Sequence, residues 1–127
     1  LAAIGHWCAF GWGKFAIEEK ASGSFVGFCG PAMDDGWPEP EISYSLVPAF
    51  HRKGYAFEAV KRVLKFAYTD LGWQTAVSQI DKDNPASQRV SEKLGATKEE
   101  EGVVFANYVA DIWRHLPPQE FLKAEIN

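Results

Sequence analysis

The segment HRKGYA, residues 51–56, lies where a predicted strand ends and the longest predicted helix of the chain begins. After it, apolar residues recur at the three-and-four spacing of one helical face. These residues are Ala56, Ala59, Val60, Val63, Leu64, Ala67 and Leu71. Gly72 is expected to end the helix as its C-terminal cap. The sequence therefore predicts a strand, a basic loop and a long amphipathic helix, in that order.

The start of this helix lacks the Ser, Thr, Asp or Asn that usually caps the first N–H groups. Arg52 and Lys53 stand instead at the positive end of the helix dipole, where each cation is unfavourable by about 0.3 to 1 kcal/mol. A bound anion would reverse that sign, and Gly54 and Ala56 leave room for it to reach the backbone. The pattern predicts a phosphate or pyrophosphate site on the loop amides. The alternative is an uncapped helix start with solvated basic side chains.

The length of 127 residues suits one domain with its own core. A net charge of -4 argues against general nucleic-acid binding and is compatible with a cationic substrate. No apolar run reaches the roughly 20 residues that a membrane span needs, and no signal peptide is recognisable, so we expect a cytoplasmic protein. Cys8 and Cys29 lack metal-site or disulfide spacing and are expected to be buried free thiols.

Alternating apolar and polar residues predict several strands, and turn residues separate them. The predicted strands are residues 11–19, 24–32, 41–47, 74–80, 97–101 and 108–116. A second, shorter helix is predicted to start with Asn84 as N-cap and Pro85 as first residue, and to end at Gly95. Residues 1–10 are either the tail of a helix or an irregular segment, and a polar tail follows Pro117. This order predicts one mixed α/β domain over residues 1–127.

Three motifs in this order resemble the GNAT superfamily of N-acetyltransferases. They are EISYSL at residues 41–46, GYAFEA at 54–59, and NPAS at 84–87 with EKLGA at 92–96. The closest resemblance is to the RimJ/RimL-like branch, and it extends from about residue 11 to residue 115. It implies acetyl-CoA as cosubstrate and transfer of its acetyl group to a primary amine, by direct attack in a ternary complex.

The resemblance also implies the fold and the cofactor contacts. The fold is a mixed, largely antiparallel sheet that splays beside a bulge in strand 41–46 and is flanked by helices. The pantetheine arm of acetyl-CoA would enter the gap and pair with the backbone of Leu46 and Val47. Asn84 and Ser87 would line the other side of the slot, Asn84 also serving as a helix cap. The pyrophosphate would bind the amides of Arg52, Lys53, Gly54, Tyr55 and Ala56.

Acetyl transfer needs a group that accepts a proton from the amine and preferably one that donates a proton to the departing thiolate. Glu41 stands where some members of the superfamily carry a glutamate that acts as base, often through water. Glu39 or water alone could substitute for it. Many relatives carry a tyrosine acid where this chain has Ser91, and Ser87, one turn earlier, is the candidate that RimL-like enzymes suggest. A serine hydroxyl is a poor acid, so either serine could instead only donate a hydrogen bond.

The N-terminal part departs from the family, because the first strand and the helices that wall the acceptor pocket should precede Gly11. The domain is therefore expected to be incomplete or abbreviated there. The aromatic residues Trp7, Trp12, Trp37, Tyr44 and Phe105 either line an acceptor groove or belong to the core. The acceptor is expected to be a protein N-terminus or a small-molecule amine.

Two other functions stay open at this point. One is a non-catalytic acyl-CoA-binding module, and the other is an interaction domain whose basic loop binds nothing. Neither cysteine lies in a motif of a nucleophile, so no covalent enzyme intermediate is expected. We expect no metal, nucleic-acid or membrane partner, and the sequence is compatible with a homodimer.

Overall fold

The computed structural model describes residues 2–34 and 36–124. Its elements include the predicted strands and both predicted helices, with an additional helix near each end. In chain order they are α1 (Ala2–Phe10), β1 (Phe15–Glu18), β2 (Phe25–Ala32), β3 (Glu41–Leu46), the 3-10 helix η1 (Pro48–Phe50), α2 (Tyr55–Thr69), β4 (Val77–Ile80), α3 (Pro85–Lys93), β5 (Thr97–Val104), β6 (Val109–Arg114) and α4 (Pro118–Ala124).

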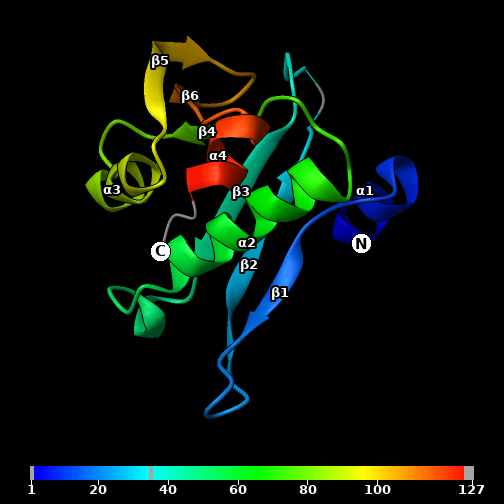
Figure 1. The fold of residues 1–127 in the computed structure, drawn as a ribbon, viewed down its shortest axis with the longest axis vertical. Coiled ribbons are helices and arrows are strands. Elements are labelled where there is room, and N and C mark those ends of the chain that lie inside the picture. The colour runs from blue at the N-terminus through cyan, green and yellow to red at the C-terminus, as the bar shows by residue number, and fades with distance from the viewer. Residues whose placement is uncertain (1, 35, 125–127) are drawn as a thin grey trace.

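The strands form one sheet in the order β1-β2-β3-β4-β6-β5 (Figure 1). Every neighbouring pair is antiparallel except β3 and β4, which are parallel and are connected by α2. A parallel neighbour requires such a crossover connection, as the strand-helix-strand order predicts. The mixed, largely antiparallel sheet flanked by helices agrees with the predicted fold.

Helix α2 packs across the face of the sheet formed by β2 and β3 (Figure 1). Its apolar stripe is buried, as the spacing predicts, and forms the main core with Cys29 of β2 and Ile42 of β3. The buried residues of the stripe are Val60, Val63, Leu64, Ala67 and Tyr68. The stripe fixes the direction of α2, and its first turn consequently lies just beyond the end of β3.

Several predicted boundaries were wrong. Helix α2 ends at Thr69, and β1 and β4 are shorter than predicted, since residues 11–14 and 74–76 lie outside the strands. Strand β5 continues to Val104, with register shifts near Gly102 that alternation alone did not reveal. The predicted polar tail instead contains α4, because Phe121 is buried against the ring of Tyr68 at 5.7 Å.

Residues 2–10 form helix α1, so the helical alternative for the N-terminal segment is confirmed. His6 holds this helix in place, because its Nε2 accepts from the Met33 N–H at 2.9 Å and its Nδ1 donates to the carbonyl of Trp12 at 3.1 Å. Both cysteines are free, but Cys8 on α1 is exposed, contrary to expectation, whereas Cys29 is buried. Within the described ranges, no helix has the length and apolar character needed to cross a membrane.

Candidate functional site

Strands β3 and β4 separate soon after they meet. Among the described residues they pair at one position, Glu41 opposite Val77. On its other side β3 keeps a constant register with β2 from Glu41 to Leu46, so the bulge expected in this strand is not present in that pairing. We call the divergence point the fork, formed by Glu41, Ile42, Val77, Ser78 and Gln79. The fork leaves one edge of β3 open toward its C-terminal end, as the splayed sheet predicts.

Backbone direction decides which groups of β3 face this gap. The N–H of Val47 donates to the carbonyl of Val26 at 2.8 Å, and the Val47 carbonyl accepts from the N–H of Phe50 at 2.9 Å. Backbone groups alternate along a strand, so those of Tyr44 and Leu46 face the gap instead. The carbonyl of Leu46 accepts a hydrogen bond from His51 at 2.9 Å.

These hydrogen bonds distinguish the two residues, Leu46 and Val47, whose backbone was predicted to contact the cofactor. The N–H of Val47 would have to leave the Val26 carbonyl to bond to a cofactor, whereas the N–H of Leu46 faces the gap by alternation. The backbone of Tyr44 was not among the predicted contacts. The pairing register with β2 shows that it also faces the gap, which the motif by itself does not reveal.

The basic loop has the geometry of an uncapped helix start. Gly54 is the N-cap residue of α2, with a left-handed φ of 82°, and no side chain caps the helix. The N–H groups of the first helical turn therefore lack intrahelical acceptors. Arg52 is also left-handed, with a φ of 62°, and Lys53 lies 5.5 Å from the centre of the Phe50 ring. The phenol of Tyr55 donates to Glu19 of the β1-β2 turn, which holds this side chain away from the loop amides.

Glu41 is the buried carboxylate of the fork, with 6% of its surface exposed. Its Oε2 accepts from the Gln79 N–H at 2.7 Å. Burial raises the pKa of Glu41 to about 7, although the Gln79 N–H and the charge of Lys14 act in the opposite direction. A carboxyl group with this pKa can accept a proton near neutral pH. The alternative base, Glu39, instead forms two hydrogen bonds with Arg114, at 2.8 and 3.0 Å.

Tyr44 and Ser87 meet on the other side of the fork. The Tyr44 hydroxyl and Ser87 Oγ are 2.6 Å apart, which joins β3 to α3. Asn84 caps α3, since its Oδ1 accepts from the Ser87 N–H at 3.2 Å, and the predicted capping role is confirmed. Burial raises the pKa of Tyr44, so its phenol stays protonated at neutral pH. Ser91 is also buried on α3.

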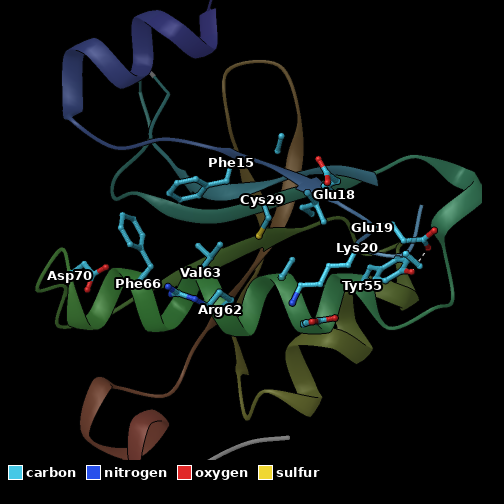
Figure 2. Close-up of a pocket in the computed structure, with 15 residues that line it drawn as sticks. Phe15, Glu18, Glu19, Lys20, Cys29, Tyr55, Arg62, Val63, Phe66 and Asp70 are labelled. Carbon is cyan, nitrogen blue, oxygen red and sulfur yellow. Dashed lines mark hydrogen bonds between the residues drawn. The ribbon is translucent and has the colours of Figure 1, made fainter. Parts of the chain in front are cut away.

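A cavity of about 780 Å3 lies elsewhere, between β1 and α2. Figure 2 shows Phe15 and Phe66 at one end of it and the bonded pair Glu19 and Tyr55 at the other. Its lining includes none of the fork residues and neither Asn84 nor Ser87. The cavity is therefore separate from the carboxylate and the phenol described above, and it reaches the basic loop only at Tyr55.

Comparison with known proteins identifies this arrangement. The model of the acetyltransferase (GNAT) domain family matches residues 2–97. The chain belongs to the GNAT acetyltransferase family. It is 30% identical over 87 residues to the uncharacterized N-acetyltransferase YoaA of Bacillus subtilis, covering 68% of this chain and 49% of YoaA. It is 32% identical over 88 residues to the uncharacterized protein YkkB of the same species, covering 68% of this chain and 51% of YkkB.

Solved structures support the same family. An acetyltransferase from Agrobacterium tumefaciens superposes with a TM-score of 0.79 at 25% identity, covering 90% of this chain and 66% of the other. A variant of the spermidine N-acetyltransferase SpeG from Vibrio cholerae gives 0.75 at 17% identity, covering 95% and 73%, and shows the fold alone. The chain spans about half the length of the curated relatives it matches. GNAT acetyltransferases use acetyl-CoA as cosubstrate, and the fork and loop are the features of this chain that suit it.

Proposed function

We propose that this GNAT domain is an acetyl-CoA-dependent N-acetyltransferase that acts on a primary amine. One observation carries the proposal: the gap between β3 and β4 has the buried carboxylate of Glu41 at the fork, where it begins, and the uncapped start of α2 beyond the C-terminal end of β3. The first supplies a group that can accept a proton, and the second supplies N–H groups for phosphate.

The proposed cofactor contacts are with backbone groups that face the gap or lie at the uncapped start of α2. The pyrophosphate would bind the backbone of residues 52–56, with Arg52 and Lys53 adding positive charge. The pantetheine arm would lie in the gap beside the backbone of Tyr44 and Leu46. The start of α3, with Asn84 and Ser87, would form the other wall.

The chemistry then uses groups on the two faces of the sheet. The amine nitrogen attacks the thioester carbonyl, the new N–C bond forms, and the C–S bond breaks. Glu41 accepts the amine proton directly or through water, using Oε1, since Oε2 is bonded to Gln79. The Tyr44 phenol, paired with Ser87, donates a proton to the departing thiolate. Tyr44 thus replaces Ser87 as the proposed acid, and Ser87 becomes its hydrogen-bond partner.

The acceptor belongs to the proposal as well. A protein N-terminus is favoured by the RimJ/RimL-like motifs, and a small-molecule amine is the other class. Assignment to that branch, a cytoplasmic location and homodimer formation stay predictions from the sequence. A non-catalytic acyl-CoA-binding module is the second candidate function, favoured by Ser91 at the position where many relatives carry a tyrosine.

Calorimetric titration with acetyl-CoA, beside free adenosine bisphosphate, tests cofactor binding. We expect saturable binding that is tighter for acetyl-CoA, and weaker binding by Gly54→Val, because a side chain there would obstruct the phosphate. The absence of binding to the wild type would refute the proposal.

Turnover with a panel of primary amines tests catalysis. Glu41→Gln is expected to lower the rate at neutral pH while the affinity for acetyl-CoA stays near that of the wild type. Binding without turnover of any amine, including peptide N-termini, would favour the non-catalytic module. An unaltered rate in Glu41→Gln would assign the base to another group or to water.

A further inference from the structure

At the fork, side chains form hydrogen bonds with backbone groups that would bond to each other if β3 and β4 stayed paired. The Gln79 N–H donates to the carboxylate of Glu41 at 2.7 Å. The carbonyl of Ile42 accepts from the hydroxyl of Ser78 at 2.8 Å. Both backbone groups are therefore satisfied, but neither bonds to the opposite strand's backbone.

Register shows that these two groups would otherwise bond to each other. The His115 N–H donates to the carbonyl of Ala76 toward β6, so by alternation the backbone of Val77 and Gln79 faces β3. The backbone of Ile42 faces β4, because that of Glu41 faces β2. With Glu41 opposite Val77, the next rung of a parallel ladder joins the Gln79 N–H to the Ile42 carbonyl.

The two replacing side chains approach from opposite faces of the sheet. Glu41 and Val77 are opposite each other and share one face, whereas Ser78, the next residue, points to the other. Both side chains are buried, with 6% of Glu41 and 5% of Ser78 exposed. Together they form a clip that occupies both partners of the missing rung.

His115 fixes the orientation of the hydroxyl. Ser78 has one proton and donates it to Ile42, so the contact of 2.8 Å between Ser78 Oγ and His115 Nε2 requires the proton to be on Nε2. His115 is 2% exposed, and its Nδ1 has no partner among the described residues. The imidazole is therefore a buried donor whose bond is to the serine.

We infer that Ser78, oriented by His115, acts with Glu41 to hold β3 and β4 apart, and that Ser78 is a positioning residue for the pantetheine slot. The inference rests on the proposed function for the identity of the ligand. The opening itself is a property of the free protein. Loss of the hydroxyl leaves the Ile42 carbonyl without a donor, and the Gln79 N–H is the backbone donor aligned to replace it.

The first test uses the free protein and NMR. In the wild type, the Gln79 amide resonance should shift as the Glu41 carboxylate titrates, because the amide donates to it. In Ser78→Ala the amide is expected to turn to Ile42 and to lose most of this pH-dependent shift, and Ser78→Thr, which keeps a hydroxyl, should restore it. An unchanged shift in Ser78→Ala would overturn the inference, whether or not acetyl-CoA binds.

The second test compares two ligands. Ser78→Ala should weaken acetyl-CoA binding by about tenfold, because the new hydrogen bond from the Gln79 N–H to the Ile42 carbonyl has to break before the slot can open, while adenosine bisphosphate binding at the loop is unchanged. Ile17→Ala, which removes core packing two strands away, should leave the ratio of the two affinities unchanged. An equal loss of both affinities in Ser78→Ala would indicate general destabilisation and contradict the positioning role. Failure of the wild type to bind acetyl-CoA would refute the proposed function. The NMR experiment would then still test whether Ser78 holds β3 and β4 apart.

Discussion

Glu41→Gln should change how the stability of the protein depends on pH. The folded pKa of Glu41 is raised to about 7 from an ordinary 4.5, so the unfolded chain releases this proton more easily. The contribution of Glu41 to stability is therefore complete below pH 4.5 and is lost as the pH rises through 7. At 1.36 kcal/mol per pKa unit, the rise from 4.5 to about 7 corresponds to about 3 kcal/mol.

Glutamine has nearly the same shape and can still accept from the Gln79 N–H, but it carries no charge. The variant should therefore gain about 3 kcal/mol relative to the wild type between acidic and weakly basic pH. Urea unfolding of both proteins across this range measures the effect. Glu58→Gln, at an exposed position on α2, is the control, because this carboxylate stays hydrated and should show no comparable gain. Parallel pH profiles for wild type and Glu41→Gln would refute the assignment of a buried, destabilised carboxylate.

Three further perturbations test other parts of the structure. Gly30→Ala would place a Cβ 2.4 Å from the Gly13 carbonyl oxygen, and urea unfolding should show a loss of about 3 kcal/mol; a loss near zero would contradict this packing. Burial lowers the pKa of His115 to about 4, so the stability that this residue contributes above pH 6.5 is lost as the pH falls through 4. In His115→Asn the free energy of unfolding, measured in urea, should therefore fall less on acidification than in the wild type, and an equal fall would contradict a buried neutral imidazole. Tyr44→Phe should lower turnover by about 100-fold with little change in acetyl-CoA affinity, measured by steady-state kinetics and calorimetry, and an unchanged rate would exclude the phenol as acid.

The elements that were predicted well are those in which local sequence and tertiary packing favour the same structure. The apolar stripe of α2 is buried where the spacing placed it. Asn84 caps α3 and Pro85 begins it, since both effects act within one turn. Helix α4 was missed because its seven residues carry little periodic signal, and burial of Phe121 against α2 stabilises it.

In the candidate site, too, some features could be predicted from the sequence and others depend on tertiary contacts. The uncapped loop at residues 51–56 is visible in the sequence from its residue types, and the carboxylate at position 41 was singled out by its place in a motif that resembles the family. The sequence already favoured Glu41 over Glu39 as the candidate base, and the structure adds that Arg114, distant in the chain, bonds to Glu39. The contact of Tyr44 with Ser87 likewise joins residues 43 positions apart.

The sequence by itself determined the family, the order of the six strands and of helices α2 and α3, and the position of the basic loop, since these depend on local pattern and short motifs. Only the tertiary structure decided which backbone groups of β3 face the gap, and how the sheet opens there. The physical reason is that both depend on strand register. Register brings the Gln79 N–H to the Glu41 carboxylate and the Ser78 hydroxyl to the Ile42 carbonyl, and no local propensity specifies such pairings.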